Sequence, residues 1–125
     1  MFCLLSAVSK LLHISEAEII QALGHDGQQV IWPEAKAPYC YRNFDLDEIL
    51  RFCITKGVAL VPHYAETVIE NPLGDTWLIE RPIRLEGRGI ILGNTPKGPH
   101  AEYYDGSITP DQFDVTIYLR AFEIK

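Results

Sequence analysis

The sequence predicts one α+β domain in which N-terminal helices pack on an antiparallel β-sheet. Two observations support this fold class: apolar residues recur at helical spacing early in the chain, and strand-like apolar runs begin only at Val58. Helices that come first and strands that follow are typical of a segregated α+β domain. The length of 125 residues fits a single domain, 1–125.

The first two helices are predicted from apolar spacing and from capping residues. Within residues 3–13, leucines and a valine recur at spacings of three and four, which gives the helix one apolar face. Ser15 followed three positions later by Glu18 is the pattern of a capping box. The helix that begins there, about 16–23, is expected to end at Gly24.

A long connection, residues 24–44, separates the second helix from the third. It contains several glycine and proline breakers, and long connections in compact domains are often functional or mobile. Asp45 then begins a third helix with an acidic residue, Glu48, at its third position. Gly57 is expected to end this helix.

Short apolar runs between turn residues make up the rest of the chain. Runs of this length bounded by glycine, proline, asparagine or aspartate are typical of β-strands. Pro62 is expected to stop the first run, and Asp105-Gly106 is a strong hairpin signal. The predicted strands are 58–61, 67–69, 77–79, 89–92, 100–104 and 115–124.

Composition and charge exclude several classes of protein. Shares of 47% hydrophobic and 22% charged residues are typical of a globular chain, and the net charge of -6 argues against nucleic acid and anionic membranes as partners. No apolar run approaches the length of a membrane span, and the apolar start lacks the basic region of a signal peptide. Three cysteines without regular spacing predict a reducing, cytoplasmic location, although secretion by another route stays open.

The candidate functional pair is a cysteine near the start of the chain and a histidine near its end. Cys3 opens a helix, whose N-terminus favours the thiolate, and the imidazole of His100 on a strand can accept the proton. Both residues also have structural interpretations. A free cysteine is often buried as a small apolar residue, and a strand histidine can simply donate one hydrogen bond at the surface.

The remaining cysteines and histidines carry no functional prediction. Cys40 lies in the long connection and Cys53 on the core face of a helix, where structural roles are expected. The other histidines have no His, Cys or Asp partners at metal-ligand spacing, so we expect neither a metal site nor a cofactor. These histidines are His13, His25 and His63.

Three segments, taken in order, are similar to those of one known family. They are the segment 3–19, which contains the cysteine-bearing helix and the turn after it, the segment 44–57 with the third helix, and the strand 89–92 followed by the histidine-bearing strand and its Asp-Gly turn, 100–106. This order resembles the papain-fold cysteine peptidases related to the bacteriocin-leader (double-glycine) processing enzymes, in particular their stand-alone branch. The resemblance implies a papain-like fold and a thiol hydrolase that cleaves a peptide or amide bond of a peptide or protein substrate.

The resemblance also implies roles for individual residues. Cys3 would attack the carbonyl as the thiolate, and His100 would accept and return the proton. In the family, an acidic or amide residue after the Asp-Gly turn orients the histidine. A count without gaps places Asp111 at that position, whereas matching Pro110 to a proline of the family places Thr109 there.

The sequence departs from the family at the oxyanion donor. The family usually places a glutamine ahead of the cysteine, and here Met1 and Phe2 precede Cys3. The backbone N–H of Cys3 would then serve among the donors. Two alternatives to the enzyme remain: a catalytically inactive papain-like module that binds a peptide or partner protein, and a homo-oligomer in which an unpaired edge of the C-terminal strand pairs with another copy.

Overall fold

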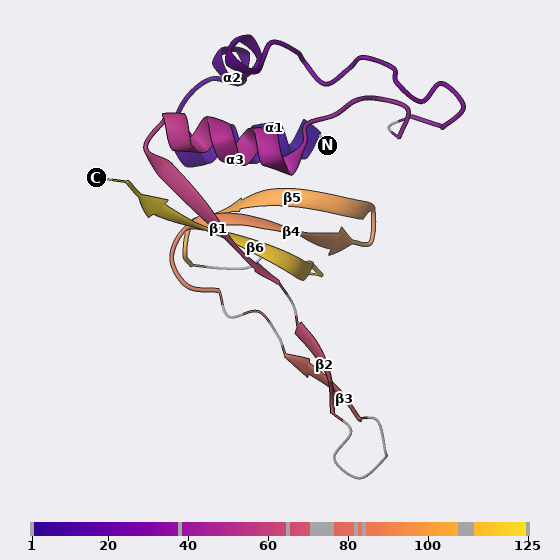
Figure 1. Ribbon diagram of the computed structural model, residues 1–125, viewed down its shortest axis with the longest axis vertical. Coiled ribbons are helices and arrows are strands. Elements are labelled where there is room, and N and C mark those ends of the chain that lie inside the picture. The colour runs from indigo at the N-terminus through magenta and orange to yellow at the C-terminus, as the bar shows by residue number, and fades with distance from the viewer. Residues whose placement is uncertain are drawn as a thin grey trace.

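The computed structural model describes the backbone of residues 2–37, 39–64, 66–70, 77–81, 83, 85–107 and 112–124. Within these ranges the chain forms α1 (Phe2–Leu12), α2 (Glu16–Leu23), α3 (Leu46–Thr55), β1 (Val58–Tyr64), β2 (Glu66–Glu70), β3 (Trp77–Arg81), β4 (Gly89–Thr95), β5 (Gly98–Tyr104) and β6 (Asp114–Glu123). Figure 1 shows the helices on one side of a sheet of β1, β4, β5 and β6, with the β2–β3 hairpin extending away. The α+β class and the helix-then-strand order are therefore confirmed.

The sheet is antiparallel throughout, with the strand order β1-β6-β4-β5. β6 lies in the interior of this sheet, where it pairs with β1 on one side and with β4 on the other. Both edges of the C-terminal strand are thus occupied. The expectation that this strand offers an unpaired edge to another copy is wrong, because the edges of the described sheet belong to β1 and β5.

β1 continues through Pro62, where the sequence predicted a stop. Proline lacks a backbone N–H, which excludes it from the interior of a sheet but not from an outer strand. β1 is an outer strand of the described sheet, and Pro62 lies opposite Leu119 of β6. The strand therefore extends to Tyr64.

The tight hairpin of the sheet lies at residues 96–97 and not at Asp105-Gly106. β4 and β5 pair as far as Thr95 and Gly98, so a two-residue connection joins them. The Asp105-Gly106 turn instead connects β5 to β6, and β4 lies between these two strands in the sheet. The turn was predicted correctly at the end of β5, but the pairing that it suggested was wrong.

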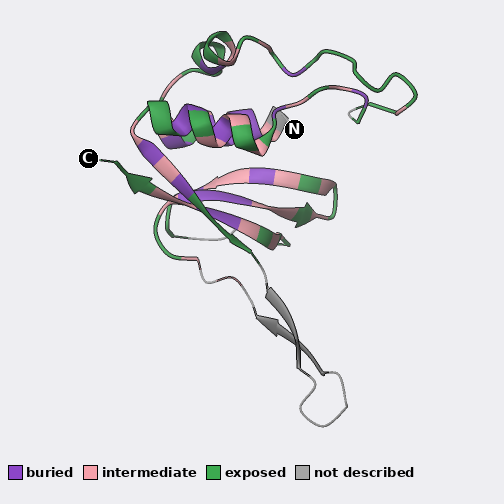
Figure 2. Cartoon of the chain, viewed as in Figure 1, coloured by how far each residue is buried: buried purple, intermediate pink, exposed green. Residues whose placement is uncertain are grey.

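Apolar clusters lie on both faces of the sheet, and Figure 2 shows buried residues along α1, α3 and the strands of the sheet. The helices cover one face, where α1 packs against β5 and β4 and α3 packs against β1. Consecutive residues of β4, Ile90 and Ile91, belong to opposite clusters, as the alternation of side chains along a strand requires. The cluster away from the helices has Ile91, Tyr104 and Tyr118 as its buried members.

The predicted start and end of the second helix and the predicted start of the third are confirmed, and α3 ends at Thr55, with Lys56 as its C-cap ahead of the predicted Gly57. Ser15 Oγ accepts a hydrogen bond of 3.1 Å from the N–H of Glu18, and Gly24 ends α2 with a positive φ of 80°. At the start of α3, the N–H of Asp45 donates to Oε2 of Glu48 at 3.3 Å. Each bond satisfies a backbone or side-chain group that the helix end would otherwise leave unpaired.

The connection from α2 to α3 is an ordered ribbon that forms an arm beside the helices in Figure 1. Backbone hydrogen bonds join its two branches, from Asn43 N–H to Gly27 O at 2.8 Å and from Ile31 N–H to Cys40 O at 3.0 Å. An ion pair between His25 Nε2 and a carboxylate oxygen of α3 anchors the base of the arm. The breakers in this segment therefore produce turns within a hydrogen-bonded ribbon.

Candidate active site

Cys3 lies in the first turn of α1 and contacts the outer edge of the sheet. Its Sγ accepts a hydrogen bond from the backbone N–H of Ala101, with a distance of 3.3 Å. β5 is an outer strand, so alternate N–H groups along it point away from β4 and out of the sheet. The thiol satisfies one of these outward N–H groups. Cys3 remains partly exposed, whereas Cys40 and Cys53 are buried.

Small residues at the contact between α1 and β5 allow this approach. Ala7 of the helix and Ala101 of the strand are both buried in the cluster between the helices and the sheet. Leu4 and Val8 extend the same buried helix face. The apolar spacing predicted from the sequence therefore places Cys3, one position before Leu4, at the border between the core and the solvent.

The hydrogen bond brings the thiol next to the backbone of His100. Because the Cα atom of His100 is separated from the nitrogen of Ala101 by two covalent bonds, or about 2.4 Å, the Cys3 Sγ lies within about 6 Å of that Cα. Cys3 and His100 therefore meet at one edge of the sheet, although they lie at opposite ends of the chain. The sequence showed no contact between them.

The imidazole of His100 itself is directed toward the other face of the strand. Its ring lies 5.8 Å from the ring of Phe113, centroid to centroid, at an interplanar angle of 53°. Its Nε2 lies 3.9 Å from Oε2 of Glu102. No hydrogen bond joins the imidazole to the thiol among the described residues. Side-chain alternation explains this, because Ala101, the next residue, faces the helices.

Two cavities meet at His100 and Glu102. A small cavity of about 80 Å³ lies between α1 and β5, and Cys3 and Lys10 line it. A larger cavity of about 610 Å³ lies near the β4–β5 turn, and Phe113 is among its lining residues. His100 and Glu102 border both cavities. A ligand in the larger cavity would therefore contact two residues that also line the cavity beside the thiol.

The orienting residues predicted for His100, Asp111 and Thr109, lie outside the described residues. Asp105 is described, and its carboxylate is engaged within its own turn. Its Oδ1 accepts hydrogen bonds from the hydroxyl of Ser107 at 2.5 Å and from the N–H of Ser107 at 2.9 Å. Both hydrogen bonds lower the pKa of the Asp105 carboxyl, and the bond from the Ser107 hydroxyl has the larger effect.

The other two cysteines have the structural placement predicted for them. Cys53 is fully buried on the core face of α3, and its burial raises the pKa of its thiol to about 11. Cys40 is buried within the arm, where its carbonyl accepts hydrogen bonds from the N–H groups of Ile31 and Trp32. Neither thiol is placed for reaction with a solute.

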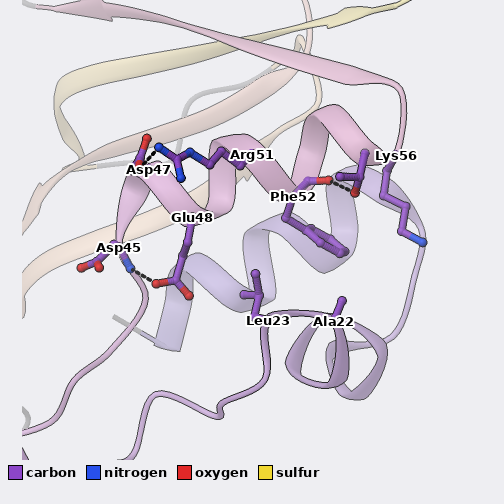
Figure 3. A pocket seen from close by; sticks show the side chains of 9 residues that line it. Ala22, Leu23, Asp45, Asp47, Glu48, Arg51, Phe52 and Lys56 are labelled. Carbon is purple, nitrogen blue, oxygen red and sulfur yellow. Dashed lines mark hydrogen bonds and ion pairs between the residues drawn. The ribbon is translucent and has the colours of Figure 1, made fainter.

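A second large pocket, between α2 and α3, is lined by three acidic residues, and the carboxylates of two of them, Asp47 and Glu48, are engaged (Figure 3). Asp47 Oδ2 lies 3.2 Å from a guanidinium nitrogen of Arg51. Glu48 accepts from the N–H of Asp45 and pairs with His25. No group of three or more His, Cys, Asp or Glu side chains able to hold a metal ion occurs among the described residues. We therefore assign this pocket no catalytic role.

The analysis of the sequence missed Glu102 and Phe113. Glu102 could have been found, because a residue two positions from His100 on the same strand shares its face. Phe113 could not, because its place over His100 depends on the order of the strands in the sheet.

Comparison of the chain with family models, with curated proteins and with solved structures finds no match. Within the described part of the chain, no helix has the length and apolar character needed to cross a membrane.

Proposed function

We propose that the protein is a papain-like thiol hydrolase that cleaves a peptide or amide bond, with Cys3 as the nucleophile and His100 as the proton carrier. The observation that carries the proposal is the 3.3 Å hydrogen bond from the N–H of Ala101 to Cys3 Sγ. It holds a partly exposed thiol in the first turn of a helix and beside His100. A partly exposed thiol with a histidine beside it is the arrangement that nucleophilic catalysis by cysteine requires.

The proposed reaction proceeds through a thioester. The Cys3 thiolate attacks the carbonyl carbon, a C–S bond forms, and His100 holds the proton taken from the thiol. The C–N bond then breaks as His100 donates that proton to the leaving amine. Water attacks the thioester, the C–S bond breaks, and the carboxylic acid product leaves as the Cys3 thiol is restored. The free N–H groups at the start of α1 are suitable donors to the oxyanion.

The proposal also includes the cellular location, the residue that orients His100 and the class of substrate. All three cysteines are free, and thiols persist in reducing compartments, which favours a cytoplasmic location. Asp111 remains the proposed orienting residue for His100, with Thr109 as the alternative. The substrate class is a peptide or protein, and no cofactor takes part in the steps above.

Cysteine labelling tests the proposal. We expect iodoacetamide near neutral pH to alkylate Cys3 much faster than Cys40 or Cys53, as mapped by mass spectrometry of proteolytic fragments. Cys53 serves as the internal control, because burial raises the pKa of its thiol to about 11. If Cys3 reacts no faster than the two buried cysteines until the protein is unfolded, the nucleophile role is refuted.

A second candidate is a module that binds a peptide or partner protein without cleaving it. The observation that favours it is the size of the two cavities. The cavity beside the thiol is about 80 Å³, whereas the one lined by Phe113 is about 610 Å³. Ligand pockets usually measure about 300–1,000 Å³. An inert Cys3 in the labelling experiment would favour this candidate.

A further inference from the structure

We propose that Glu102 and Phe113 hold the imidazole of His100 away from the Cys3 thiol in the ligand-free protein, and that rotation of the His100 side chain switches the site on. This inference rests on the proposed function and adds its regulation. It assigns a role to two residues that the sequence did not single out. His100 and Glu102 line both cavities, and Phe113 lines the larger one.

The contact with Glu102 fixes one end of the imidazole. His100 and Glu102 are two positions apart on β5, so their side chains leave the strand on the same face. The carboxylate lies 3.9 Å from Nε2, the ring nitrogen farther from the backbone. The two side chains are 40% and 38% exposed, so the pair is weak enough to open and close readily.

The contact with Phe113 fixes the face of the imidazole. The two rings lie 5.8 Å apart in a tilted arrangement, which is within the usual range for attractive ring pairs. Gln112, the residue before Phe113, has a positive φ of 60°, a conformation that residues other than glycine seldom adopt. Phe113 also packs against the cluster of Ile91, Tyr104 and Tyr118. The imidazole therefore contacts a side chain that is itself packed against this cluster.

A side-chain rotation is sufficient to reach the thiol. The backbone of His100 is already next to Cys3 through the hydrogen bond of Ala101. Rotation about the Cα–Cβ bond carries Nδ1, the ring nitrogen nearer the backbone, toward the edge of β5. Exposed side chains make such rotations within nanoseconds. The contacts with Glu102 and Phe113 thus set the fraction of molecules in which the imidazole faces the thiol.

The test compares the rate of Cys3 alkylation in four proteins, each with and without His100→Ala: the unsubstituted chain, Phe113→Ala, Glu102→Gln and the control Leu85→Ala. Leu85 packs on the same cluster as Phe113, so its truncation loosens this face of the sheet without removing a contact of His100. We expect Phe113→Ala to raise the rate about three- to tenfold. We expect Glu102→Gln to raise it about two- to fivefold. Both increases should vanish when His100 is alanine, and Leu85→Ala should have no effect.

The possible outcomes separate this inference from the proposed function. If His100→Ala slows Cys3 alkylation but neither Phe113→Ala nor Glu102→Gln accelerates it, the holding contacts are refuted and the nucleophile stands. If His100→Ala leaves the rate unchanged in every background, the proposed function fails. An increase that persists without His100, or that also appears for Cys53, reflects general opening of the fold and overturns the inference.

Discussion

Replacing Gly93 with alanine is expected to reduce the free energy of unfolding by about 3 kcal/mol or more, the upper range for overpacking a well-filled interior. A Cβ atom at this position would lie 1.9 Å from the carbonyl oxygen of Asp114 and 3.0 Å from Cα of Val115. Both are backbone atoms of the neighbouring β6, so no side chain can move aside. Gly93 also lies opposite His100 in the sheet, so the distortion of β4 would occur next to the candidate site.

Chemical denaturation of Gly93→Ala measures this effect, and Asn94→Ala is the matched control. Asn94 is the next residue of the same strand and is exposed, so its truncation should change stability by less than about 0.5 kcal/mol. If Gly93→Ala lowers the free energy of unfolding by less than about 1 kcal/mol, β4 and β6 separate more easily than their close approach implies.

His100→Ala is expected to slow alkylation of Cys3 about tenfold near neutral pH, because labelling proceeds mainly through the molecules in which the His100 side chain has rotated toward the thiol. A thiol without an imidazole partner is only a few per cent thiolate at this pH, and the thiolate is the reactive form. The substitution should change the free energy of unfolding by less than about 1 kcal/mol, because the His100 side chain is only partly buried. The measurement is the rate of iodoacetamide labelling in the folded protein.

The control for this prediction is His63→Ala. His63 is also a strand histidine that contacts an aromatic ring, that of Tyr118, but it lies on β1, the opposite edge of the sheet from β5. Its substitution should leave Cys3 labelling unchanged. Equal rates for His100→Ala and the unsubstituted chain would show that the imidazole does not stabilise the thiolate.

Local sequence patterns predicted the elements well because local chemistry determines them. The capping by Ser15 and the positive φ of Gly24 involve neighbours within four residues, and these were recovered. The error at Pro62 arose because the effect of a proline depends on whether its strand lies at the edge of the sheet. That position is a property of the whole fold.

Long-range pairing limited what could be predicted about the site. The Asp105-Gly106 signal suggested that β5 pairs with the strand after it, yet β4 lies between them. Cys3 and His100 were paired by a resemblance and by the chemistry of their side chains, without any sign of contact in the sequence. The hydrogen bond of Ala101 supplies the spatial link between them. Phe113 depends on strand order and could not be found from the sequence.

The most direct test of the central claim, that Cys3 and His100 act together, is cross-linking with dibromoacetone. One end of this reagent alkylates a thiol, and the other then alkylates a nucleophile within a few bonds of it. We expect peptide mapping to show a bridge between Cys3 and His100, because the hydrogen bond of Ala101 places the thiol beside the histidine backbone. A bridge from Cys3 to Lys10, which lines the same small cavity, or no bridge at all, would contradict the account.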